Sequence, residues 1–432
     1  MTTSRRNLLT GLAATGFASA ALASSRSGRS LSGPTKQAPA PSPDAIYEKP
    51  SPLSEAEFNS KKIDGVCAAE INDFSPCGYT SPFVPSPPHA DLNPRKAVIV
   101  RWKAAKHRFV FSHEASYAPW IELPGKVGLC NQFFESNQAA ELFNQFGRRE
   151  RNSSVDIIES GPKRVWIRWN YTCVHEVEDE HPALRGTEDY VAYPNGLVWR
   201  RLTYESLCPN SPDGYSWQPI DFFCLAPAAA TWADLFARDP QHGDYLVGSV
   251  IDAYSSRRYD KFWDDHGRPR RIGDADLLLE ISRSRGLAMI APFKAGCAFT
   301  VLGASSGFPS AKSQVVDHSF KDTGGWGWGA IRWDHWPVGW VNSEAHTASA
   351  ALNVPYSFGQ FSHYIIDRPI INAKVDFPLA VNNMALNRWT ERHVYYTLAG
   401  TAHNVESIRR LARRWLDKGA DCANPESVKD LI

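Results

Sequence analysis

The sequence predicts a mostly β protein, a large two-sheet β-sandwich with a C-terminal helix. Three observations predict it: strands that alternate apolar and polar residues, a strong hairpin turn, and an aromatic-rich composition. Tryptophan (15), tyrosine (15) and phenylalanine (21) make up 12% of the 432 residues, whereas only 3 are methionine. Aromatic side chains favour strands and offer flat apolar faces for packing or for ligands.

The strongest hairpin surrounds the Pro-Asn-Gly sequence at 194–196. Strand-like residues 188–193 lead into this turn, and residues 197–202 leave it. Asn-Gly accepts the positive φ angles that tight hairpin turns require. The pattern therefore predicts two antiparallel strands joined at this turn.

Residues 165–171 alternate with the period of a strand, which places Trp166, Arg168 and Asn170 on one face. Similar runs predict several further strands. They cover residues 97–102, 107–111, 277–281, 288–290, 298–302 and 361–366.

The best helix follows Asn404, a plausible N-cap. Its apolar stripe comprises Val405, Ile408, Leu411, Trp415 and Leu416. Four arginines fall largely off this stripe, namely Arg409, Arg410, Arg413 and Arg414. A solvated basic face is favoured for them over an anion site. Residues 130–146 could form one helix or a loop with a helical turn.

The N-terminus resembles a twin-arginine translocation signal, because residues 4–9 read Ser-Arg-Arg-Asn-Leu-Leu and a weakly apolar stretch follows. Small-x-small sequences at 18–20 and 21–23 fit signal-peptidase cleavage. We expect a signal peptide at 1–23, a Pro/Ser-rich linker at 24–53 and one β-sandwich unit at 54–432. The twin-arginine export machinery is then a partner, and the mature chain is periplasmic or secreted.

Charge and hydropathy exclude two other classes. Lys plus Arg is 47 and Asp plus Glu is 46, so nothing favours nucleic acid as a partner. Beyond the N-terminus no apolar run is long enough to predict an integral membrane span in the mature protein. The 8 cysteines form no C-x-x-C pair, which disfavours a zinc ribbon.

The segment richest in chemistry is 317–346, where glycine alternates with tryptophan among charged residues. Indole faces stack on sugar rings, and glycine lets the backbone approach a ligand. A saccharide groove is favoured over a Trp-rich core strand. The expected substrate-binding residues are Trp326, Trp328, Trp333, Trp336, Trp340, Asn342 and His363.

Several residues in and after this segment are candidate catalysts. His335 could act as a general acid or base. Arg332 could neutralise a uronate carboxylate. Tyr356 or Tyr364 could protonate a leaving oxygen. A structural histidine, a surface ion pair and packing tyrosines are the plainer interpretations.

Asp334 and Glu344 could instead form the carboxylate pair of a glycosidase, although most carboxylates are simply exposed. Histidines at 318, 335, 346 and 363 lack the spacing of a strong metal motif. We therefore expect no cofactor, with a divalent metal as the weaker alternative.

Several stretches, in a consistent order, resemble a largely uncharacterised group of exported bacterial β-sandwich proteins associated with polysaccharide breakdown. They are residues 148–153, 158–165, 168–171, 193–201 and 334–338. The His-Trp-Pro-Val sequence at 335–338 resembles one that a more polar loop follows in that group. The resemblance implies a supersandwich of the kind found in polysaccharide lyases and sugar mutarotases, and it assigns no catalytic residue.

The sequence thus favours an exported polysaccharide lyase that cleaves a uronate-containing glycan by β-elimination. A glycoside hydrolase with an Asp/Glu pair and a non-catalytic glycan-binding envelope protein are the alternatives.

Overall fold

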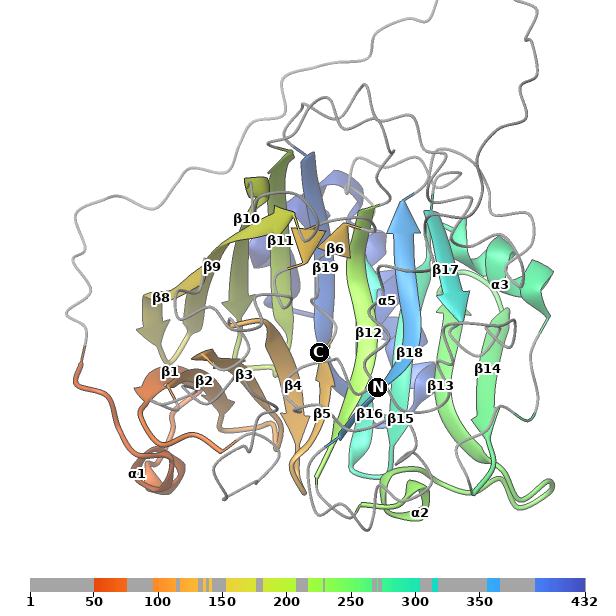
Figure 1. The fold of residues 1–432 in the computed structure, drawn as a ribbon, viewed down its shortest axis with the longest axis horizontal. Coiled ribbons are helices and arrows are strands. Elements are labelled where there is room, and N and C mark those ends of the chain that lie inside the picture. The colour runs from red at the N-terminus through yellow and green to blue at the C-terminus, as the bar shows by residue number, and fades with distance from the viewer. Residues whose placement is uncertain are drawn as a thin grey trace, which may run out of the picture. The chain divides into compact units, whose positions relative to one another are not determined.

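The computed structural model confirms a mostly β, two-sheet sandwich with a C-terminal helix (Figure 1). The residues it describes belong to one compact unit. They are 50–75, 96–113, 117–130, 135–136, 140–141, 153–175, 182–206, 217–227, 230–265, 270, 274–303, 313–317, 356–365 and 393–431.

The first sheet contains eight antiparallel strands. In spatial order they are β1 (Val66–Ile71), β2 (Ala97–Trp102), β3 (Arg108–Ser112), β4 (Pro119–Leu123), β5 (Val127–Cys130), β12 (Trp217–Ala226), β18 (Tyr356–Ile365) and β17 (Ser313–Asp317). We call it sheet I.

The second sheet, sheet II, contains nine antiparallel strands. In spatial order they are β8 (Ser153–Gly161), β9 (Arg164–His175), β10 (Pro182–Ala192), β11 (Val198–Ser206), β19 (His393–Ala402), β16 (Gly296–Leu302), β15 (Leu287–Phe293), β13 (Tyr245–Asp252) and β14 (Arg258–Trp263). A short hairpin of β6 (Glu135–Ser136) and β7 (Ala140–Glu141) connects β12 to β9. Through it the backbone pairing is continuous across all 19 strands.

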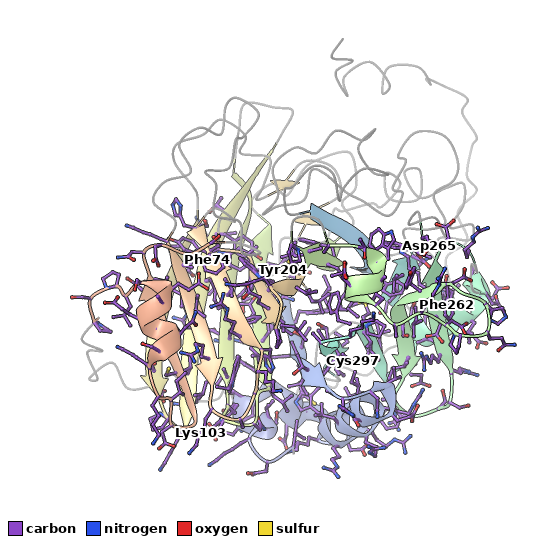
Figure 2. All side chains as sticks on the ribbon, turned by 90° about the horizontal axis from the view of Figure 1, so that it is seen from below. Phe74, Lys103, Tyr204, Phe262, Asp265 and Cys297 are labelled. Atoms are coloured by element: carbon purple, nitrogen blue, oxygen red, sulfur yellow. The ribbon has the colours of Figure 1, made fainter. Side chains whose placement is uncertain are left out.

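The main core lies between the two sheets, because alternate residues of each strand point inward. On β9 the inward residues are Val165, Ile167, Trp169 and Tyr171, all buried. Tyr204 on β11 belongs to the same core and is labelled in Figure 2. The predicted outward set, Trp166, Arg168 and Asn170, is half-buried, which confirms the alternation.

The predicted hairpin is also confirmed. The β10–β11 register pairs Ala192 with Val198, and Gly196 adopts φ +84° in the turn. Two side chains from the β2–β3 region hold this turn: Trp102 Nε1 donates to the Tyr193 carbonyl at 2.7 Å, and His107 Nε2 lies 3.0 Å from the Gly196 carbonyl. The turn therefore fixes the β10–β11 register and ties it to the first sheet.

The outer face of sheet II is partly covered by α5 (Val405–Leu416) and two 3₁₀ turns, η7 (Gly419–Ala423) and η8 (Pro425–Val428). Asn404 caps α5 as predicted, accepting a hydrogen bond from the Ser407 amide at 2.9 Å. The prediction of a solvated basic face is wrong for Arg409. Its guanidinium is buried and donates to the carbonyls of Asp252 and Ser255.

The outer face of sheet I is partly covered by α1 (Glu55–Ser60), whose Phe58 joins an apolar cluster there. Arg108 bonds Glu55 at 2.7 Å and Glu122 at 2.6 Å, so an ion-pair network also pins this helix. The other α-helices among the described residues are α2 (Trp232–Leu235) and α3 (Ala275–Ser282).

Two predictions of local structure are wrong. The expected strand 277–281 lies in α3, because Asp274 caps the segment and only Leu278, Ile281 and Ser282 are buried, on one helical face. Of the two alternatives for residues 130–146, one continuous helix is wrong, because residues 135–136 and 140–141 form β6 and β7. Among the described residues, no helix is long and apolar enough to cross a membrane.

Candidate functional site

Most of the sequence-predicted site lies outside the described residues. This holds for Trp326, Trp328, Arg332, Trp333, Asp334, His335, Trp336, Trp340, Asn342 and Glu344. For the two candidate tyrosines, the structure gives the backbone positions, which are both on β18. Tyr356 pairs with Ala226, and Tyr364 pairs with Gln314. The roles predicted for all these residues remain predictions.

His363 is the one predicted site residue whose side chain is described. It lies between the sheets with 1% of its surface exposed. Its Nδ1 lies 2.8 Å from the Tyr395 hydroxyl, and its Nε2 lies 2.5 Å from the Ser313 hydroxyl. Burial lowers its pKa to about 3, so the ring is neutral and both nitrogens are engaged.

A polar group that the sequence did not single out lies on the outer face of sheet II. Asp189 on β10 pairs directly with Arg168 on β9 and with Arg201 on β11. Its carboxylate accepts Arg168 Nε at 2.8 Å and Arg201 Nη2 at 2.5 Å. We call these three residues the arginine row.

Burial differs sharply within the arginine row. The Asp189 side chain is 2% exposed, whereas those of Arg168 and Arg201 are 37% and 38% exposed. Although burial works to raise the pKa of Asp189, hydrogen bonds from the two arginines hold it below its usual range. The carboxylate therefore stays charged and orients two guanidinium groups toward solvent.

The row carries more positive than negative charge. Two guanidinium groups share one carboxylate, so the net charge of the row is +1. Arg201 Nε is also buried and has no hydrogen-bond partner within the described part of the chain. Such an arrangement suits one additional carboxylate, which guanidinium groups bind by charge-assisted hydrogen bonds.

Aromatic side chains border the row. Trp166 donates its indole N–H to Asp189 at 2.9 Å, and the guanidinium carbons of Arg164 and Arg168 each lie 6.0 Å from its ring centroid. Tyr396 on β19 is the cross-strand neighbour of Arg201. Both aromatics are only partly buried against the cluster beneath α5. The face thus combines stacking surfaces with cationic donors.

Glu188 and Arg200, the chain neighbours of Asp189 and Arg201, form a second ion pair on the opposite face of sheet II. Arg200 donates to Glu188 at 2.5 and 2.8 Å, and both side chains are fully buried between the sheets. Tyr171 and Tyr190 donate their hydroxyls to the same carboxylate. Because no solvent reaches this pair, we interpret it as part of the core.

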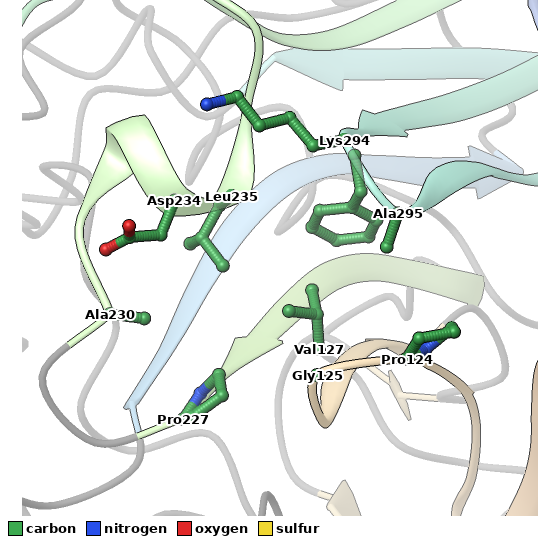
Figure 3. Close-up of a pocket in the computed structure, with 10 residues that line it drawn as sticks. Pro124, Gly125, Val127, Pro227, Ala230, Asp234, Leu235, Lys294 and Ala295 are labelled. Carbon is green, nitrogen blue, oxygen red and sulfur yellow. The ribbon is translucent and has the colours of Figure 1, made fainter.

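A pocket of about 450 Å³ lies at one end of the sandwich, beside the turns that follow β4 and β15 (Figure 3). Val127, Pro227, Leu235 and Phe293 are among the apolar residues that line it. Its charged residues serve the local structure: Asp234 accepts the Thr231 hydroxyl at 2.7 Å in the cap of α2, and Lys294 donates to the Ala233 carbonyl. The pocket therefore offers few polar groups for recognition.

Among the described residues, no three His, Cys, Asp or Glu side chains are placed to hold a metal ion. No protein-family model matches the chain, and no curated protein is detectably similar to it in sequence. The arginine row, with Trp166 and Tyr396, is the accessible group of polar and aromatic side chains that best fits a ligand site.

Proposed function

We propose that this is an exported carbohydrate-active protein whose outer face on sheet II binds a uronate-containing glycan. One observation carries the proposal: the buried Asp189 holds two half-exposed arginines beside Trp166. A uronate offers a carboxylate to the guanidinium groups and a sugar face to the indole. Export by the twin-arginine route, to the periplasm or beyond, is part of the same proposal and depends on the N-terminal sequence.

The preferred reaction is β-elimination. A base removes the proton from C5 of the uronate, the electron pair forms the C4–C5 double bond, and the C4–O bond breaks as the leaving oxygen takes up a proton. Neutralising the carboxylate makes the C5 proton easier to remove, a task that suits Arg168 and Arg201. The sequence predicts His335 as the base and Tyr356 or Tyr364 as the proton donor. Both tyrosines belong to β18 of sheet I, so elimination on the outer face of sheet II would need another group to supply the proton.

A non-catalytic glycan-binding protein is the second candidate. Asp189 is the carboxylate of the row, and its two ion pairs prevent it from acting as a base. The described part of the face therefore binds without reacting unless other residues complete it.

The test measures binding and turnover separately. Mature protein is titrated with a panel of neutral and acidic oligosaccharides, and new ultraviolet absorbance reports the unsaturated product of elimination. We expect Arg168→Gln and Arg201→Gln each to weaken binding of an acidic glycan by about tenfold, the worth of one charge-assisted hydrogen bond.

Arg238→Gln is the matched control, because this exposed arginine also pairs with one aspartate, Asp265, at 2.8 Å. Binding without product selects the non-catalytic alternative. Reducing-sugar release without ultraviolet absorbance selects a hydrolase. Equal affinity of the row variants and the wild type for every acidic glycan would refute the assignment of this face.

A further inference from the structure

The side chains around the arginine row determine which acidic glycans it can accept. Every second residue of a strand shares a face, so the next row of side chains lies about 7 Å along the strands on either side. On one side this row, from β8 to β11, comprises Ser154, Asn170, Thr187 and Thr203. On the other side it comprises Glu159, Trp166, Val191 and Trp199. Neither neighbouring row adds a cation.

The first of these, which we call the neutral row, offers hydrogen bonds without charge. Thr187 is the cross-strand partner of Asn170 and donates its hydroxyl to the Asn170 amide oxygen at 3.0 Å. Both side chains are half-buried, and the Asn170 amide nitrogen makes no hydrogen bond within the described part of the chain. An amide donor held in this way suits a hydroxyl or N-acetyl oxygen of an uncharged sugar.

A carboxylate borders the arginine row on its β8 side. Asp156 is the direct cross-strand neighbour of Arg168, which places their Cβ atoms about 5 Å apart. Asp156 is exposed and forms no ion pair among the described residues. Solvent screens its charge, so the two arginines still attract one carboxylate. A second anionic group on this side would meet a like charge.

The other cations on this face of β8 to β11 cannot hold a second carboxylate beside the first. Arg164 bonds Glu159 at 2.5 Å and Glu426 at 3.1 Å. Arg185 lies two rows beyond Asp189, about 14 Å along β10, with a glutamate as its cross-strand neighbour on β11. A carboxylate on a sugar adjacent to the bound uronate would therefore lose water without gaining a cation.

We propose that the arginine row selects a uronate whose neighbouring sugars are uncharged, as in a glycan that alternates uronates with neutral residues, and that it disfavours polyuronates. The inference rests on the proposed function of this face and adds the class of acidic glycan. One carboxylate balances the net charge of the row. The sugar next to it bonds Asn170 and Thr187, where a second carboxylate finds no counter-charge.

The experiment titrates mature protein by calorimetry at low ionic strength with two tetrasaccharides, one that alternates uronate with N-acetylhexosamine and one of four uronates. We expect the alternating tetrasaccharide to bind about fivefold more tightly, the worth of one lost hydrogen bond or one like-charge contact. Asp156→Asn removes the like charge and should narrow this ratio. Tetrauronate that binds wild-type protein as tightly as the alternating tetrasaccharide would overturn the inference.

Asn170→Lys provides the sharper variant, because it supplies the missing cation in the neutral row and should raise tetrauronate affinity to that of the alternating tetrasaccharide. Asn72→Lys is the matched control, since it adds the same charge at an exposed asparagine after β1 of sheet I. Equal ratios in these two variants would also overturn the inference. Failure of the proposed function looks different: Arg201→Gln would then leave the binding of both tetrasaccharides unchanged.

Discussion

Glu188 and Arg200 form an ion pair that is completely enclosed between the two sheets. Their chain neighbours, Asp189 and Arg201, repeat the pairing on the outer face, because successive side chains of a strand point to opposite sides. One hairpin thus supplies a sealed pair to the core and an accessible pair to the candidate site.

The buried pair yields the first prediction. Arg200→Met leaves the Glu188 carboxylate enclosed without its guanidinium and should lower the free energy of unfolding by about 3–5 kcal/mol. Adding Glu188→Gln removes the orphaned charge and should recover part of that loss. Denaturant unfolding measures both. A double variant as unstable as the single one would show that the charge is not responsible. Arg238→Met, whose pair is more than half exposed, should change stability by less than about 1 kcal/mol.

The second prediction concerns Asp189→Asn. This change makes the outer face more positive, yet it removes the charged acceptor that orients Arg168 and Arg201. If orientation decides recognition, affinity for an acidic glycan should fall even though the charge rises, and the unfolding free energy should drop by about 2 kcal/mol. An affinity that rises instead would point to simple charge attraction.

The third prediction is a loss of stability in acid. Burial lowers the pKa of His107 to about 4 and that of His363 to about 3, both from 6.5. The folded protein keeps these rings neutral, while the unfolded chain takes up protons below pH 6.5. Stability is therefore full above pH 6.5 and declines as the pH falls toward 4 and 3, by about 3 kcal/mol per histidine at pH 4.

Denaturant unfolding across that pH range checks the decline. His363→Asn should show a shallower dependence than the wild type, because one of the two depressed groups is gone. An unchanged slope would mean that His363 is accessible to protons in the folded state.

The fourth prediction tests the packing beneath the site. A Cβ atom at Gly186 would lie 2.2 Å from the Tyr171 ring, which is held by its bond to Glu188. Gly186→Ala should therefore destabilise the protein by about 1–3 kcal/mol. Gly161→Ala, whose Cβ would meet its nearest neighbour at 3.8 Å, serves as the control in thermal unfolding. Similar melting of both variants and the wild type would show that Tyr171 can move.

Local sequence patterns predicted most strands, because alternation and turn motifs depend only on residues that are close in sequence. Alternation on β9 and the Asn-Gly turn between β10 and β11 are examples. The same approach failed at 277–281, where an apolar run fits a helix and a strand equally well and the Asp274 cap decides the outcome.

The arginine row was harder to predict, because its residues come together only through the register between neighbouring strands. The hairpin turn alone places Asp189 opposite Arg201, so two of the three residues of the row could have been predicted from the sequence. Arg168 joins only through the β9–β10 pairing, which spans a longer connection. The tryptophan-rich segment, by contrast, was predicted as a site from its composition alone, and the roles of His335 and Arg332 remain predictions.

The position of β19 has a consequence for how the chain can come apart. This strand bonds β11 on one side and β16 on the other, and among the described strands it alone joins these two parts of sheet II. Until residues 393–402 take their place as β19, strand β11 and strand β16 each lack a pairing partner on the side where the two parts of sheet II meet. Assembly of sheet II must therefore wait for partners far away in the sequence, which favours slow folding.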